Sequence, residues 1–118
     1  RVEEAITPKT RAVIATHLYG NLCEMTELLS IGEKFNIPII EDAAEALGSS
    51  YFEKKCGSLG DIGILSFNGN KIITTSGGGA LLSDDEEIIK TVNQNIVVKN
   101  AMIWLRKEPY WSNLAIVK

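Results

Sequence analysis

The sequence lacks the residue sets that mark metal, redox and disulfide-rich proteins. Its 118 residues contain a single histidine and two cysteines, Cys23 and Cys56, with no Cys-x-x-Cys pair. A structural zinc site needs four cysteine or histidine ligands, so we expect no metal. Two cysteines that stand far apart do not indicate a disulfide. We therefore expect two free thiols in a reducing compartment, the cytoplasm.

The sequence also lacks an excess of positive charge and any long apolar run. Its formal net charge is -3, and its lysines and arginines form no basic stripe. We therefore expect neither nucleic acid nor an anionic membrane as a partner. No uninterrupted apolar run exceeds five residues, whereas a membrane-spanning helix needs about 20. What is present, 45% hydrophobic and 23% charged residues, is typical of a globular domain.

The chain does not open as a complete protein would. Its first residue is Arg1 rather than methionine, and residues 2–6 read like the inside of a helix. We therefore expect a fragment of a longer polypeptide.

Hydrophobic patterning in the first half predicts a βαβ unit. Residues 12–17 and 37–41 are short apolar runs rich in β-branched residues, as in buried strands. Between them, Asn21 with Glu24 three residues later predicts a helix start, and Asn36 predicts its left-handed end. A strand, a helix and a strand within about thirty residues predict two parallel strands.

The second half predicts further strands and one more helix. Residues 43–48 read as a turn or a short helix, 53–61 as a loop, 63–67 as a strand and 72–75 as a short extended piece. A strand over 79–82 follows the glycine triplet. Ser83, with Glu86 three residues later, predicts a capping box and a helix over 84–95. Beyond residue 96 the pattern fades.

Two polar residues follow the predicted apolar strands. Asp42 lies at the carboxyl end of the strand over 37–41, where ligands bind in open α/β sheets; the alternative is an aspartate that caps the turn after it. Lys71 lies on a polar turn after the strand over 63–67. Partial desolvation there favours the neutral, nucleophilic amine, and the alternative is an ordinary surface lysine. His17 ends the first strand, where we expect a structural hydrogen-bonding residue rather than a catalyst.

The glycine triplet at residues 77–79 allows a tight turn or the close approach of a ligand. It lacks the spacing of a P-loop, which places a lysine and a serine or threonine directly after the second glycine. A phosphate-binding module in which Lys71 acts only through its charge therefore stays open as an alternative.

Several segments, in this order and spacing, resemble one enzyme family. The chain closely resembles the sugar aminotransferases of the DegT/DnrJ/EryC1/StrS type over about residues 2–95. The segments that carry the resemblance are Ile6–Ile14 (ITPKTRAVI), His17–Asn21 (HLYGN), Glu41–Gly48 (EDAAEALG), Gly57–Asp61 (GSLGD), Leu65–Lys71 (LSFNGNK) and Gly77–Ala80 (GGGA).

The resemblance implies an α/β fold: part of the large domain of a fold-type-I pyridoxal phosphate (PLP) transferase, with three α/β/α layers and a mostly parallel sheet. Residues 1–95 would form the central part of this PLP-binding domain, and residues 96–118 would be a divergent or truncated tail. The intact enzyme would be a cytoplasmic homodimer, and we expect the fragment alone to be inactive.

The resemblance also implies roles for four residues. Lys71 would be the Schiff-base lysine that binds pyridoxal 5'-phosphate and then shuttles a proton. Asp42 would pair with the pyridine nitrogen and keep it protonated, so that the ring accepts electrons. Ser66 would hydrogen-bond the phosphate, and Glu45 would lie near the 3-oxygen of the ring.

The implied reaction transfers an amino group, from glutamate, to a nucleoside-diphosphate 4-keto-6-deoxysugar, for amino-sugar and surface polysaccharide biosynthesis. Two further readings stay open. The chain could be a non-catalytic truncated remnant of such an enzyme, or it could resemble the PLP-dependent sugar dehydratases of the same family. Lys71 argues against the dehydratase, because in those relatives a histidine replaces the lysine.

Overall fold

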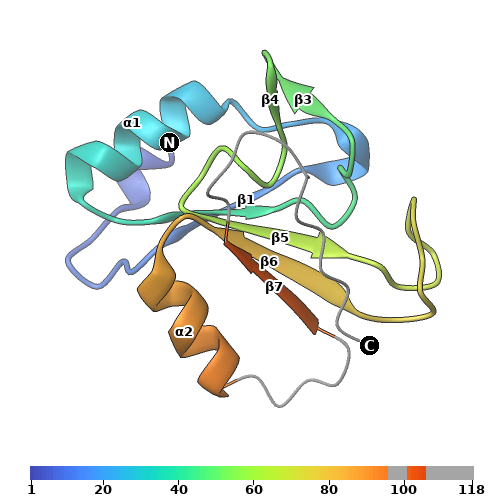
Figure 1. Ribbon diagram of the computed structural model, residues 1–118. Coiled ribbons are helices and arrows are strands. Elements are labelled where there is room, and N and C mark those ends of the chain that lie inside the picture. The colour runs from blue at the N-terminus through green and yellow to red at the C-terminus, as the bar shows by residue number, and fades with distance from the viewer. Residues whose placement is uncertain (96–100, 106–118) are drawn as a thin grey trace.

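A five-stranded sheet organises the computed structural model, which describes residues 1–95 and 101–105 (Figure 1). Its strands lie in the order β1 (Val13–Thr16), β2 (Ile39–Asp42), β5 (Ile62–Ser66), β6 (Gly79–Ser83) and β7 (Ala101–Leu105). Neighbouring strands are parallel except for β5 and β6, which are antiparallel. The mostly parallel α/β architecture predicted from the sequence is therefore confirmed.

The first half of the chain forms the predicted βαβ unit. Helix α1 (Met25–Phe35) connects β1 to β2, and the two strands pair in parallel, with Val13 opposite Ile39. The helix packs on one face of the sheet, where Met25, Ala15 and Ile39 are buried together. Two short 3-10 helices, η1 (Glu3–Ala5) and η2 (Leu18–Gly20), precede the helix.

The start of α1 was predicted wrongly, and its end correctly. Asn21 closes η2, and α1 begins only at Met25, after an N-cap residue, Glu24, that makes no side-chain capping bond. The main-chain carbonyl of Glu24 accepts the first helical bond, from Leu28 N–H at 3.2 Å. At the other end Asn36 adopts the left-handed conformation, with φ 51° and ψ 49°, as its residue type suggested.

Helix α2 (Glu86–Asn95) begins two residues later than the capping-box pattern predicted. Its first turn is capped by Asp85, whose Oδ1 accepts the amides of Glu87 at 2.8 Å and Ile88 at 3.3 Å. Ser83 Oγ instead donates to the carbonyl of Asp61 at 2.8 Å and accepts the Asp85 amide. Ser83 thus ties the end of β6 to the start of β5.

Three further differences from the sequence prediction concern short elements. Residues 72–75 form bends rather than an extended piece, because Lys71 N–H closes a turn onto Asn68 and Thr75 N–H returns to Phe67. The expected loop over 53–61 contains a short strand, β4 (Lys54–Lys55), which pairs with β3 (Ser50–Tyr51). Strand β7 was not predicted and lies beyond residue 96, while the rest of the expected tail lies outside the described residues.

Two buried clusters form the core. One contains Ala15, Met25 and Ile39 beneath α1. The other lies under the segment after β2 and consists of Ala43, Ala46, Cys56, Leu65, Ala80 and Leu82. On the opposite face of the sheet the residues Ile14 and Ile64 are 65% and 39% exposed. Within the described part of the chain, no helix is both long enough and apolar enough to cross a membrane.

Gly63, in the middle of β5, allows the segment 57–60 to lie directly against the strand. A Cβ at this position would lie only 2.0 Å from the carbonyl oxygen of Gly57, which is backbone and cannot rotate away. We expect Gly63→Ala to lower the free energy of unfolding by about 3 kcal/mol, the upper end of the range for overpacking. Denaturant unfolding measures this change. Gly69→Ala is the matched control, since a Cβ there meets nothing within 4 Å, and an equal loss in both variants would contradict the packing argument.

Candidate functional site

The candidate site lies at the carboxyl ends of two neighbouring parallel strands. Asp42 is the last residue of β2 and Ser66 the last residue of β5. In the sheet Asp42 is opposite Ile64, two residues before Ser66. Since side chains alternate along a strand, Asp42 and Ser66 project from the same face of the sheet. The structure thus places both predicted residues at one edge, where ligands bind in open α/β sheets.

Asp42 is half-buried and held by the backbone around it. Its Oδ1 accepts the amide of Ala44 at 3.2 Å, and its main-chain carbonyl accepts the amide of His17 at 3.0 Å. The capping contact that the sequence offered as the alternative reading is therefore present. It occupies Oδ1, and the carboxylate has a second oxygen with which to accept a bond from a ligand.

Lys71 and Glu45 are brought together from segments 26 residues apart. Lys71 Nζ lies 3.4 Å from Glu45 Oε1, and the two side chains are 17% and 34% exposed. The second carboxylate oxygen, Oε2, is buried without a hydrogen-bond partner. A buried polar atom without a partner is costly, so this oxygen and the adjacent amine mark a place for a polar ligand group.

Ser66 completes the predicted set. Its side chain is half-buried, and its Oγ accepts the amide of Asn68 at 3.5 Å. The hydroxyl hydrogen therefore remains available for donation to an anionic group. Asn68 also begins the turn that ends at Lys71, whose amide donates to the Asn68 carbonyl at 3.0 Å. One short turn thus links the hydroxyl to the amine.

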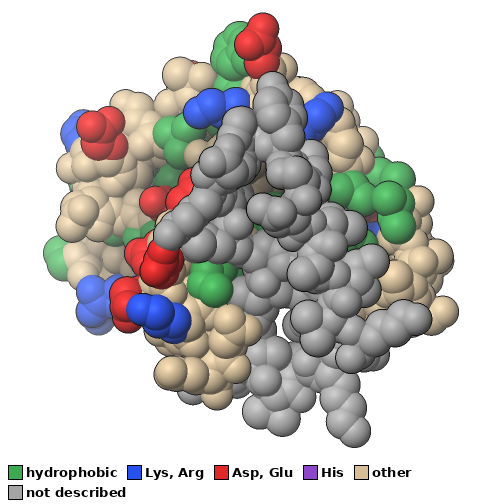
Figure 2. Space-filling model, viewed as in Figure 1, with side chains coloured by type: hydrophobic (Ala, Val, Ile, Leu, Met, Phe, Trp, Pro, Cys, Tyr) green, Lys and Arg blue, Asp and Glu red, His purple; other side chains and the backbone are tan. Residues whose placement is uncertain are grey.

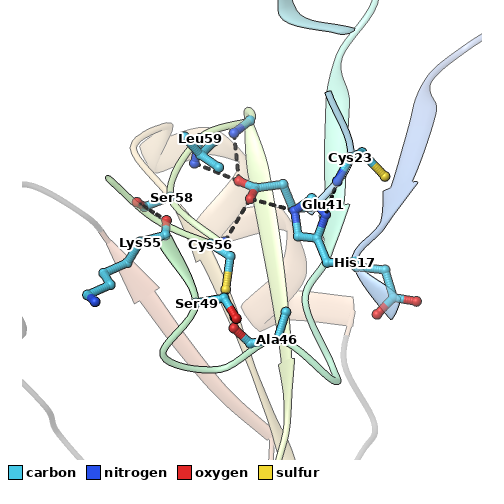
Figure 3. Close-up of polar contacts among 12 residues, drawn as sticks. His17, Cys23, Glu41, Ala46, Ser49, Lys55, Cys56, Ser58 and Leu59 are labelled. Atoms are coloured by element: carbon cyan, nitrogen blue, oxygen red, sulfur yellow. Dashed lines mark hydrogen bonds and ion pairs between the residues drawn. The ribbon is translucent and has the colours of Figure 1, made fainter. Parts of the chain in front are cut away.

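Sequence reasoning missed Glu41, which forms a buried cluster with His17 beside the candidate site (Figure 3). Both side chains are fully buried, and His17 Nε2 lies 3.1 Å from Glu41 Oε2. Glu41 also accepts three backbone amides: Gly57 at 2.8 Å, Leu59 at 2.6 Å and Gly60 at 2.7 Å. His17 is therefore the structural hydrogen-bonding residue that we expected.

One signal in the sequence could have identified Glu41. Alternation along β2 places Ile39 and Glu41 on the same face, which is the buried one. A carboxylate at a core-facing position needs partners, and few side chains nearby can supply them. The glycines at 57 and 60 leave the backbone of the following loop open to approach, so their amides are the natural donors.

The free thiols of Cys23 and Cys56 occupy different environments. Burial raises the pKa of the Cys56 thiol above its ordinary value of 9.0, and the nearby Glu41 carboxylate raises it further. The folded state therefore binds this proton more tightly than the unfolded state. Its contribution to stability is complete below pH 9.0 and is lost as the pH rises above that value.

We expect the free energy of unfolding to fall above pH 9, by up to about 1.4 kcal/mol per pH unit from this thiol alone. Denaturant unfolding at pH 7, 9 and 10 measures the decline. In Cys56→Ala the decline should be smaller. An equal pH dependence in Cys56→Ala and in the wild type would show that the Cys56 thiol does not contribute.

Charged side chains of both signs lie on the face of the molecule that Figure 2 shows. Figure 2 shows lysine and arginine side chains separated from one another and interspersed with acidic ones on this face, rather than gathered in a basic patch.

Two hollows lie away from the candidate site. The first lies between α1 and α2, and its lining includes Leu29, Asp61, Ser83 and Ile88. The second lies beside the β3–β4 hairpin, and its lining includes Thr26, Tyr51 and Leu59.

The fold is similar to that of solved structures of an aminotransferase from Psychrobacter cryohalolentis and of a PLP-containing dehydratase. The structure of DesI in the presence of its TDP-sugar product matches with a TM-score of 0.74 and 34% identity, over 78% of this chain and 24% of DesI. The Escherichia coli GDP-4-keto-6-deoxy-D-mannose-3-dehydratase with bound hydrated PLP matches with a TM-score of 0.69 and 30% identity, over 78% and 24%.

The chain belongs to the DegT/DnrJ/EryC1/StrS aminotransferase family, whose sequence model matches residues 1–114. That match reaches past residue 95, the point at which the resemblance in the sequence was expected to end. The GDP-perosamine synthase of Caulobacter vibrioides is 52% identical over 75 residues, which is 64% of this chain and 20% of that protein. The chain thus spans about a fifth of the length of such curated relatives.

Proposed function

We propose that this chain carries the catalytic centre of a PLP-dependent aminotransferase that acts on nucleotide-linked keto-sugars. The observation that carries the proposal is the ion pair between Lys71 Nζ and Glu45 Oε1, which follows the strand ends that bear Asp42 and Ser66. The other carboxylate oxygen of Glu45, Oε2, is buried without a partner.

The residues at the edge fit pyridoxal 5'-phosphate. Lys71 offers an amine for its aldehyde, Asp42 a carboxylate for its ring nitrogen and Ser66 a hydroxyl for its phosphate. The partnerless Oε2 of Glu45 offers an acceptor to a ring substituent that carries a proton. When bound, the cofactor supplies an electron sink that stabilises negative charge at the amino carbon of the substrate.

The side chains of this chain then have separable tasks. Asp42 holds a proton on the ring nitrogen, and its bond from the Ala44 amide fixes the carboxylate for that task. Lys71 Nζ carries a proton to and from the reacting carbon once the amine is free. Glu45, at 3.4 Å, keeps the freed amine close to the site between these transfers.

The proposed substrate class rests on relatives. One matched protein is a GDP-perosamine synthase, and one matched structure contains a TDP-sugar product. We infer a nucleoside-diphosphate 4-keto-6-deoxysugar as amino acceptor and glutamate as donor, in amino-sugar synthesis for surface polysaccharides. A cytoplasmic homodimer is part of the same proposal. The dehydratase match keeps loss of water as the alternative reaction.

The test uses a polypeptide that carries this chain at the full length of its relatives, called here the family-length protein. After PLP is added, glutamate should convert the pyridoxal form to the pyridoxamine form, which absorbance follows. A nucleotide-linked 4-keto-6-deoxysugar should then restore the first spectrum and gain nitrogen, which mass spectrometry detects. Loss of water from the sugar without gain of nitrogen would favour the dehydratase, and no conversion by glutamate would contradict the proposal.

A further inference from the structure

The buried carboxylate of Glu41 is the centre of a cluster of hydrogen bonds. Its carboxylate accepts four donors, two on each oxygen: the His17 ring and the Gly57 amide on Oε2, and the Leu59 and Gly60 amides on Oε1. Converging backbone amides of this kind make an anion site. Here the Glu41 carboxylate occupies that anion site. Its hydrogen bonds to the loop over 57–60 hold the loop against β2 in the interior of the protein.

His17 connects the Glu41 cluster to a third segment, the one around Cys23. Its Nδ1 accepts the backbone amide of Cys23 at 3.3 Å, so the ring proton is on Nε2, which donates to Glu41. The His17 side chain therefore links the segment that leads into α1 with the end of β2. Its own backbone amide donates to the carbonyl of Asp42 at 3.0 Å. Figure 3 shows the ring between Cys23 and Glu41.

These contacts meet at the peptide that leads into the candidate site. Glu41 is covalently next to Asp42. The end of β2 is therefore held at two points: by the buried carboxylate of Glu41, and by the carbonyl of Asp42, which accepts the His17 amide. Beyond Asp42 the chain is fixed again, because the Ala43 amide donates to the carbonyl of Ile64 at 2.9 Å. The loop also lies directly on β2, since a Cβ at Gly60 would come within 2.5 Å of the carbonyl oxygen of Ile39.

We propose that Glu41 and His17 are positioning residues that orient Asp42 through the end of β2. They lie in the interior and act on the site only through Asp42. The functional meaning of this orientation rests on the proposed aminotransferase function, because only there does the direction of the Asp42 carboxylate matter. The positioning itself is a property of the cofactor-free protein and can be measured without any ligand.

The test is hydrogen exchange at single amides in the cofactor-free family-length protein, comparing Glu41→Gln with the wild type. A glutamine keeps the shape of the side chain, but its amide group cannot accept the two donors that one carboxylate oxygen now accepts. We expect exchange at Gly57, Leu59 and Gly60 to accelerate by at least about tenfold. If the cluster positions Asp42, exchange at Ala43 and Ala44 should accelerate by at least about threefold as well.

Two further variants make the result specific. His17→Ala removes one donor and leaves the three loop amides, so it should change the same amides to a smaller extent even if Glu41→Gln does not fold. His17→Gln can donate to Glu41 and accept from Cys23, and it should restore protection at Ala44. Glu27→Gln, on the exposed surface of α1, is the matched control and should change nothing.

Exchange that rises at the loop but not at Ala43 and Ala44 would overturn the proposal, as would a uniform rise throughout the described residues. Either result would assign the cluster a stabilising role alone. This outcome is independent of the proposed function, which fails separately if Lys71 does not bind the cofactor. The local pattern of exchange would support positioning even in that case.

Discussion

Lys71→Arg in the family-length protein should retain its fold and lose amino transfer. A guanidinium keeps the positive charge beside Glu45 but stays protonated and cannot act as a nucleophilic amine. It also cannot move a proton to and from the reacting carbon. We expect turnover to fall by about 100-fold to 10,000-fold, the range for loss of a proton-transfer group. Steady-state assays with glutamate and the keto-sugar measure the loss.

The matched control for this prediction is Lys54→Arg. Lys54 lies exposed on the β3–β4 hairpin, away from the β2 and β5 ends, and its replacement should leave turnover unchanged. Thermal unfolding of both variants should show that each is folded at the assay temperature. If Lys71→Arg keeps more than a tenth of wild-type turnover, Lys71 is not the amine that reacts.

Asp42→Asn should leave PLP bound and slow transamination by tenfold or more. The asparagine Oδ1 can still accept the Ala44 amide, so the turn after β2 should form as before. A neutral amide cannot hold the ring nitrogen protonated, and the electron sink weakens. A tenfold loss corresponds to about 1.4 kcal/mol of activation free energy. Single-turnover rates with glutamate measure this step without product release.

This substitution separates the two readings of Asp42 that the sequence left open. A capping residue loses little on replacement by asparagine, because asparagine is an equally good cap. A residue that stabilises charge loses most of its effect. A loss below about tenfold, with unchanged PLP affinity, would reduce Asp42 to a cap.

Much of the fold could be predicted because its signals are local. The apolar runs that became β1, β2, β5 and β6 are short and bounded by polar or glycine-rich turns, and those of β1 and β2 are also rich in β-branched residues. Asn36 marked the end of α1, since few other residues adopt its left-handed conformation without strain.

The errors arose where a choice depends on contacts distant in sequence. Asn21 and Ser83 both match helix-capping patterns. Asn21 instead ends the 3-10 helix η2, and the Ser83 hydroxyl donates a hydrogen bond to the carbonyl of Asp61, beside the neighbouring strand. Strand β7 follows a segment without a clear period, and only its pairing with β6 defines it. Hydrophobic patterning cannot report such pairings.

The candidate site shows the same division. Asp42, Ser66 and Lys71 were identified from strand ends and family resemblance, and their roles remain predictions. The distance of 3.4 Å between Lys71 and Glu45 depends on how two turns fold together, so no local pattern contains it. Glu41 was overlooked because its partners are backbone amides, which every residue but proline carries.

The central claim is that Lys71 is the amine that binds the cofactor. Borohydride reduction of the family-length protein after addition of PLP, followed by peptide mapping, tests it most directly, because reduction fixes the cofactor to the amine that holds it. We expect the label on the peptide that contains Lys71, together with loss of the cofactor's visible absorbance. A label on Lys54, Lys55 or Lys90, or no label at all, would contradict this assignment.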